Sequence, residues 1–435
     1  MRKLAWGVIG AALGLALWAA AASAVRPGAR VRSTVRPGLS QAQIRDLDIE
    51  FYRKRVERDS LSARDFTQLA GLYLQRARVT ADNQDLVRAE EIARHSLRLR
   101  TSRNGAAFGI LASSLLAQHR FSEALEVSKQ LVDYDSSSIS ARGLLGETQL
   151  ELGQYDEARR TLGSLASYRR DLSVAPRMAR WQELYGHPEA ARQLLREARD
   201  EAGRQHGIPQ EQRAWFHLRL GDLALRNGHA GEAERELRAG LKISPSDYRL
   251  LGMMARLEAA RHHWESAIRF GEDAIAQALD PATLGLIGDA YAALGDSIKS
   301  RDYYHAMEVT VLHQPGAFHR AWSLFLLDHG REVPAVLAKV SEEIETRRDI
   351  YGYDLLAWAL HRSGRDVEAR APMKQALALG TKDAMLFYHA GMIEHALGDQ
   401  RAAQRDLALA LTINPIWHPT QPAEARALLD SLATH

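Results

Sequence analysis

The chain has 435 residues, of which 46% are hydrophobic and 26% are charged, and its formal net charge is +3. This balance is typical of a globular protein with a large core, and the small surplus of positive charge gives no indication of nucleic-acid binding. The sequence contains no cysteine, which excludes disulfides, thiol nucleophiles and cysteine-based metal sites.

Residues 1–24 have the pattern of an export signal. Two basic residues precede an apolar run over residues 4–21, and a small-x-small cleavage site ends at Ala24. The run is also long enough to span a bilayer. Three interpretations follow: a cleaved signal, an uncleaved anchor with the body outside the cytoplasm, and an anchor in the reverse orientation. The first predicts a periplasmic protein, and the second predicts that residues 4–24 tether the protein to the inner membrane.

Two short segments follow the export signal. Residues 25–39 contain two Pro-Gly pairs and four arginines, a composition typical of a flexible tether. Residues 40–61 carry Ile44, Leu47 and Phe51 at helical spacing. This spacing predicts an amphipathic helix that caps the N-terminus of the segment that follows.

From here to near the C-terminus the sequence repeats itself with a period of about 34 residues. One small residue marks each repeat, a second small residue follows twelve positions later, and in most repeats a glycine lies between them. One spacing is longer, at 42 residues. The first marks are Ala112, Gly146, Ala179, Gly221, Ala255, Gly288, Ser323, Ala357 and Gly391.

This pattern predicts pairs of antiparallel helices that cross closely, because only a small residue on each helix lets the two backbones approach. The intervening glycine supplies the positive φ that a helix C-terminus and turn require. One pair cannot bury its own apolar face, so the pairs must stack on one another. The sequence therefore predicts an all-α fold, an α-solenoid.

The period, the paired small residues and the glycine between them resemble the tetratricopeptide repeat (TPR). The resemblance covers residues 62–416 and about ten repeats, with residues 417–435 as a C-terminal capping helix. It implies a right-handed superhelix and, together with the export signal, an exported bacterial protein of this family. Two closely matching repeats contain Leu145-Gly146 … Gly153-Gln154-Tyr155 … Ala158 and Ile287-Gly288-Asp289-Ala290-Tyr291 … Gly295.

No motif in the sequence indicates catalysis. Phosphate-binding loops, dinucleotide-binding loops and nucleophile elbows have no match. The 17 histidines include no pair at the helical spacing of three or four residues that metal binding on one helix face needs. The sequence therefore predicts no enzyme, no cofactor and no metal site.

The resemblance also implies where a partner binds. In TPR proteins the first helices line a concave face, and positions 2, 5, 9 and 12 of each repeat point into the groove. Aromatic residues are favoured at binding hot spots, and here they gather in the last two repeats. Packing between helices is the competing interpretation, and an unused surface is the third. The predicted groove residues are Asp222, Arg256, Asp289, Tyr351, Asp354, Trp358, His361, Tyr388, Met392 and His395.

The function that follows from these observations is a non-catalytic protein–protein interaction scaffold of the bacterial cell envelope. Its partner is an unidentified protein or peptide held in the concave groove. The alternative is a periplasmic binding protein for a small ligand, glycan or metal, which would use the C-terminal histidines and aromatic residues. A third hypothesis, an enzyme with a site between repeats, requires a deep pocket that holds titratable groups of shifted pKa.

Overall fold

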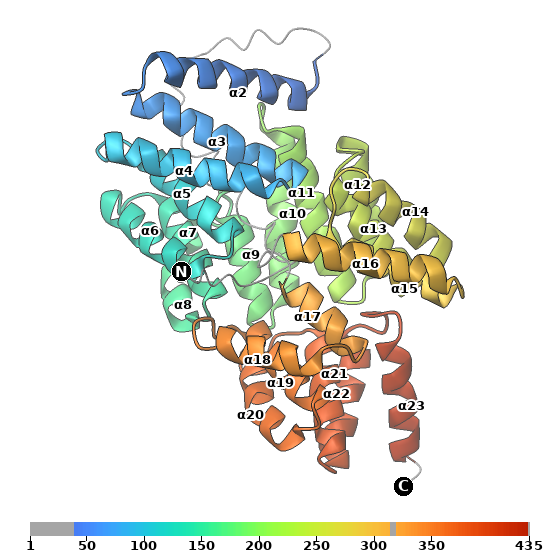
Figure 1. Cartoon of the computed structure of the whole chain (residues 1–435). Coiled ribbons are helices and arrows are strands. Elements are labelled where there is room, and N and C mark those ends of the chain that lie inside the picture. Colours follow the sequence, from blue (N-terminus) through green and yellow to red (C-terminus); the bar gives the residue numbers. More distant parts are fainter. Residues whose placement is uncertain (1–38, 314–318, 434–435) are drawn as a thin grey trace. The chain divides into compact units, whose positions relative to one another are not determined.

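The computed structural model describes residues 39–313 and 319–433. The predicted export signal and all but the last residue of the tether lie outside these ranges. The described residues form α-helices and one short 3-10 helix, with no strand among them (Figure 1). None of the described helices combines the length and the apolar character that a membrane crossing requires.

The chain divides into two compact units, and the boundary falls within one helix, α9 (Ala175–Leu184). The N-terminal unit contains the described residues of Ala11–Glu151 and Tyr155–Arg177, and the C-terminal unit contains Leu152–Gln154 and those of Met178–His435. In the N-terminal unit the helices are α2 (Gln41–Arg58), α3 (Ala63–Thr80), α4 (Asn83–Leu99), α5 (Gly105–Ala117), α6 (Phe121–Tyr134), α7 (Ile139–Glu151), α8 (Tyr155–Gly163) and η1 (Ala166–Tyr168).

The C-terminal unit continues the same succession of helices and ends with a lone helix. Its helices after α9 are α10 (Pro188–Arg204), α11 (Gln210–Arg226), α12 (Ala230–Ile243), α13 (Tyr248–Ala260), α14 (Trp264–Ile275), α15 (Pro281–Ala293), α16 (Ser297–His313), α17 (His319–Asp328), α18 (Val333–Glu343), α19 (Ile350–Arg362), α20 (Asp366–Ala376), α21 (Ala384–Ala396), α22 (Gln400–Ile413) and α23 (Gln421–Ala433).

Close helix crossings explain the small residues of the repeat. A Cβ atom added to Gly146 would lie 2.7 Å from Leu162 on the paired helix, and one added to Gly391 would lie 2.6 Å from Leu407. The partner marks Ala158 and Ala403 are fully buried. From α2 to α8 and from α10 to α23, each helix packs on the next. First helices of successive repeats also contact one another, as α11 contacts α13. The predicted all-α solenoid is therefore confirmed.

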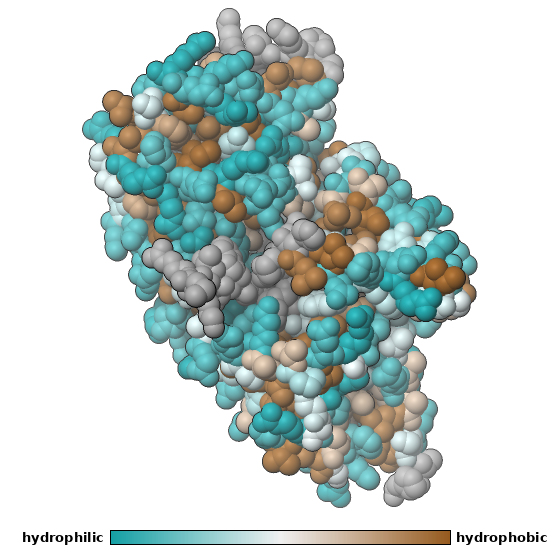
Figure 2. Space-filling view, in the orientation of Figure 1, coloured by the Kyte–Doolittle hydropathy of each residue, from teal (hydrophilic) through white to brown (hydrophobic). Residues whose placement is uncertain are grey.

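Helix ends are defined by side chains that the sequence places there. The hydroxyl of Ser40 accepts a hydrogen bond from the backbone of Gln43, whose side chain accepts one from the backbone of Ser40. This reciprocal capping starts α2 within the segment predicted as the N-terminal cap. The segment predicted as the C-terminal cap contains α23. On the face drawn in Figure 2 hydrophilic residues predominate, with smaller hydrophobic areas between them.

Two loops near the end of the C-terminal unit form hydrogen bonds to the ends of helices near its beginning. The hydroxyl of Thr381 donates to the carbonyl of Leu184, the last residue of α9, and the side-chain amide of Asn414 donates to the carbonyl of Leu225 at 2.8 Å. Carbonyls at a helix C-terminus have no partner within their own helix. Residues almost 200 positions later in the sequence therefore satisfy the ends of α9 and α11. The repeat pattern did not predict this closure.

Candidate functional site

The ten predicted groove residues all lie on first helices of the C-terminal unit, and the structure divides them into three groups and two separate residues. Asp222, Arg256 and Tyr351 belong to a charged network. Asp354, Trp358, His361 and Tyr388 belong to a cluster of aromatic rings and histidines, and Asp289 pairs with another histidine. Met392 packs partly buried against the core, and His395 is exposed.

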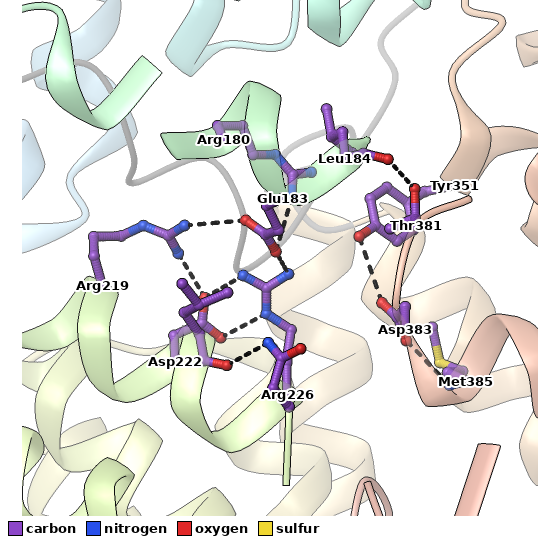
Figure 3. Close-up of polar contacts among 12 residues, drawn as sticks. Arg180, Glu183, Leu184, Arg219, Asp222, Arg226, Tyr351, Thr381, Asp383 and Met385 are labelled. Carbon is purple, nitrogen blue, oxygen red and sulfur yellow. Dashed lines mark hydrogen bonds and ion pairs between the residues drawn. The ribbon is translucent and has the colours of Figure 1, made fainter. Parts of the chain in front are cut away.

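The charged network centres on two carboxylates and three guanidinium groups from α9 and α11. Figure 3 shows the guanidinium of Arg226 between the carboxylates of Glu183 and Asp222. Arg219 pairs with Asp222 at 2.5 Å and with Glu183 at 3.7 Å, and Arg180 lies 3.4 Å from Glu183. Four of these five residues are buried, and Arg226 is nearly so. The pairing therefore takes place in a medium that screens charge poorly.

The electrostatics of this network favour the charged forms of both carboxyls. Burial opposes the ionisation of Asp222, but Arg226 and Arg219 outweigh it and lower the pKa of Asp222 to about 2. Burial also opposes the ionisation of Glu183, and Arg226 and Arg180 lower its pKa in the same way. Paired charges of this kind are costly to separate, because the remaining partner would stay buried and uncompensated.

Tyr351 connects this network to the later repeats of the unit. Two guanidinium groups contact its ring, those of Arg320 at 4.3 Å and Arg180 at 5.4 Å from the ring centroid. Its hydroxyl donates to Asp383 at 3.4 Å (Figure 3). Burial raises the pKa of Tyr351 to about 12, so the phenol stays neutral over the physiological range. The two cation–π contacts make this ring part of the internal packing.

A second cluster joins α19 to α21. Nδ1 of His389 lies 2.7 Å from Asp354, and both side chains are completely buried. Since a carboxylate can only accept, this nitrogen carries the proton. The ring of His389 stacks on Trp358 with centroids 4.1 Å apart, and Trp358 donates to Asp328 at 2.9 Å. These contacts connect neighbouring repeats.

The remaining members of this cluster also bond within the chain. The hydroxyl of Tyr388 donates to Glu424 of α23 at 2.7 Å, and Nδ1 of His361 lies 2.5 Å from Asp366. Tyr388 is buried, and the side chain of His361 keeps only 16% of its surface exposed. Among the described residues, no three His, Asp or Glu side chains converge as a metal site would require.

Asp289 forms the third group with His329 and Tyr304. Its Oδ1 accepts from the hydroxyl of Tyr304 at 2.7 Å and lies 3.0 Å from Nε2 of His329. Nδ1 of His329 lies 2.8 Å from the carbonyl of Phe325. Both ring nitrogens therefore face acceptors, an arrangement that only the imidazolium form satisfies. Burial opposes this charge, but the hydrogen bond to Asp289 outweighs it and raises the pKa of His329.

We expect this histidine to make stability depend on pH. Because its folded-state pKa is raised, its contribution is complete below the unfolded pKa of about 6.5 and is lost as pH rises through the folded pKa. His329→Gln should therefore be most destabilising at about pH 5.5, below the unfolded pKa, and its effect should become smaller as pH rises through the folded pKa. Urea unfolding of both chains across this range measures the difference. A constant difference would contradict the assignment. Groups that face the ring are Asp289, Tyr304 and, more distantly, Asp328.

Sequence reasoning missed several residues of these clusters. Arg180 and Glu183 occupy positions 9 and 12 of their repeat, the same positions that selected Asp222 and His361. The repeat register could therefore have identified both. His389 sits one place after a groove position, and no signal in the sequence distinguished it. Asp328 and Glu424 likewise carried no signal, because their contacts depend on how α17 and α23 pack.

Comparison with known proteins supports the repeat assignment. Residues 115–185 match the model of a family described as tetratricopeptide repeat. This segment contains the repeat marks Gly146, Gly153 and Ala158. The family match therefore covers one part of the predicted array. No curated protein sequence matches the chain.

Two solved structures are similar at a low level. One is the crystal structure of the APC/C hetero-tetramer Cut9–Hcn1, with 13% identity, a TM-score of 0.34, and coverage of 91% of this chain and 96% of that chain. The other is the crystal structure of yeast Tom70, with 10% identity, a TM-score of 0.32, and coverage of 84% and 96%. At these scores neither structure carries an argument about fold or function.

Proposed function

We propose that this protein is a non-catalytic interaction scaffold of the bacterial cell envelope that binds an acidic segment of a partner protein. The binding surface is the accessible part of the first helices of the C-terminal unit around Arg256 of α13. Tetratricopeptide repeats in the chain support this kind of function. Fold alone does not establish function, so the proposal rests on a particular side chain.

Arg256 is the observation that carries the proposal. It lies within electrostatic range of Asp222 and Asp383, and burial lowers its pKa below the usual value for arginine. Among the described residues, however, no carboxylate lies within ion-pair distance of its guanidinium, whereas Arg219 and Arg226 are both paired. A partly exposed guanidinium in this state is suited to a carboxylate supplied by another molecule.

The proposal does not use every predicted groove residue. Tyr351, Asp354, Trp358 and Tyr388 are buried, so we place the partner contact elsewhere. Their burial supports the interpretation as packing between helices. Binding of a small ligand, glycan or metal by the C-terminal histidines and aromatic residues stays a prediction. Trp358, Tyr388 and His361 bond within the chain, so these three residues do not favour it.

Affinity capture tests the role of Arg256. The wild-type chain, Arg256→Ala and Arg238→Ala should each be used as bait in the cell-envelope fraction of the host. Arg238 is a matched control, because it is exposed and its one ion pair within the described part of the chain is with Glu234 of its own helix. We expect one partner to be recovered with the wild-type chain and the control and to be lost with Arg256→Ala. Equal recovery with all three baits would reject this surface.

The envelope location is a separate part of the proposal, and it rests on the pattern of residues 1–24. An intact mass that corresponds to a chain beginning at Val25, in the periplasmic fraction, is the expected result. A full-length chain confined to the cytoplasm would contradict it.

A further inference from the structure

An open groove of about 700 Å³ lies on the N-terminal unit between α4, α5 and α6. Its floor is apolar, and its two sides carry opposite charge: arginines on α4 and glutamates on α6. Figure 2 shows hydrophobic surface between hydrophilic residues over this part of the unit. The floor consists of Leu97, Phe108, Leu111 and Val127, and the sides consist of Arg94 and Arg98 opposite Glu123 and Glu126.

One ion pair bridges the two sides of the groove, and the other charged groups on these sides do not bridge it. Arg94 and Glu123 lie 3.3 Å apart and join α4 to α6. Arg98 is exposed, and no described carboxylate lies within ion-pair distance of it. Glu126 is 66% exposed, and among the described residues it forms an ion pair with Lys129 of its own helix alone. An apolar floor between a basic and an acidic side is suited to an amphipathic helix with charged edges of the opposite arrangement.

The same chain presents such a helix at the start of this unit. α2 packs on α3, with Arg45 and Ile49 buried. On another face, Leu47 and Phe51 are 57% and 54% exposed. They lie four residues apart and therefore form one continuous apolar stripe. Exposed apolar pairs of this size are a feature of contact surfaces when charged residues surround them.

Charged residues of α2 complement the groove. Glu57 supplies an acidic group beside the stripe, whereas Glu50 pairs with Arg53 at 3.6 Å and with Lys54 at 3.2 Å on the same helix. Arg58 continues the stripe at the C-terminal end of the helix and makes that end basic. The carboxylate of Glu57 matches the guanidinium of Arg98 on α4, and the basic end matches Glu126 on α6. α2 has 18 residues and α4 has 17, so the two helices are also of matching length.

We propose that the outer face of α2 from one copy of this chain occupies the groove between α4 and α6 of a second copy. The two contact surfaces are different parts of the chain, so the interface is heterologous. Each copy then keeps one surface free, and association continues beyond a dimer unless the rotation closes a ring. This self-association is independent of the partner proposed for Arg256.

Sedimentation equilibrium of the full chain tests the proposal. The wild-type chain should show an average mass that rises with concentration beyond that of a dimer. Phe51→Glu, which removes the stripe, should abolish association. Leu97→Glu, which blocks the floor, should abolish it as well. Because Leu97 is partly buried, Glu126→Lys provides a second groove variant on an exposed residue, and it should weaken association.

Mixing two defective chains distinguishes this interface from others. Phe51→Glu retains the groove and Leu97→Glu retains the stripe, so an equimolar mixture should form a dimer that does not grow. Circular dichroism of each variant controls for folding. A wild-type chain that stays monomeric at all concentrations would overturn the proposal, and so would occupation of these surfaces by another protein. Association that survives Phe51→Glu, or a mixture that stays monomeric, would overturn it too.

Discussion

Replacing Gly288 with alanine will lower the free energy of unfolding of this protein by about 1–3 kcal/mol, although the change adds one methyl group. A Cβ atom at this position would lie 2.4 Å from the ring of Tyr304 on the paired helix and 3.2 Å from the carbonyl of Ser300. The ring is anchored because its hydroxyl donates to Asp289. To make room for the added methyl group, either the ring of Tyr304 must move or α15 and α16 must move apart.

A matched control uses the same substitution where space is available. Gly203 lies exposed near the end of α10, and no atom lies within 4 Å of the position that its Cβ would occupy. Gly203→Ala should therefore stabilise the chain by up to about 1 kcal/mol through helix propensity. Urea unfolding, combined with hydrogen exchange of α15 and α16, measures both effects. Equal effects of the two substitutions would show that the close crossing at Gly288 does not exist.

Asp222→Asn will destabilise the chain by about 3–5 kcal/mol at neutral pH, because it leaves buried guanidinium groups without one of their two carboxylates. The destabilisation caused by this substitution should become smaller as the pH falls. The folded-state pKa of Asp222 is lowered to about 2 from 3.8, so its contribution is present above the unfolded pKa and is lost as pH falls through the folded pKa. The stability difference between the two chains should therefore shrink between about pH 4 and pH 2.

An exposed ion pair provides the control for this prediction. Asp156 pairs with Arg159 at 3.3 Å and is 74% exposed, so Asp156→Asn should change stability by less than about 0.5 kcal/mol. Unfolding midpoints of the three chains from pH 2 to pH 7 give the comparison. A loss of stability at Asp222 as small as that at Asp156 would mean that water reaches the network. In that case the carboxylate of Asp222 would be accessible to a partner.

Much of the fold could be predicted from the sequence because the repeat pattern is local. The spacing of Gly146 and Ala158, or of Gly288 and Ser300, is decided by the geometry of two adjacent helices. The closing contacts of Thr381 and Asn414 could not be predicted in this way. They depend on the superhelical rotation from one repeat to the next. This rotation accumulates over several repeats, so the sequence of a single repeat does not determine it.

The candidate site could be predicted only in part for the same reason. Repeat position placed Asp222, Arg256 and Asp289 on first helices, but it did not reveal which of them the chain would pair internally. That outcome depends on residues contributed by other repeats, such as Glu183 for the charged network and His329 for Asp289. Arg256 differs from Asp222 and Asp289 in the side chains that surround it in the folded chain. The spacing of the repeats does not predict these surroundings.

The contacts that join the beginning and the end of the C-terminal unit constrain how this array can change in evolution. An open solenoid can gain or lose one repeat, or fray from its last helix, without disturbing distant repeats. Here Thr381 must meet Leu184, and Asn414 must meet Leu225. Insertion or deletion of one repeat between them would move both donors away from their acceptors. The number of repeats in this unit is thus fixed by its own closure, and the unit should melt as a whole rather than from its ends.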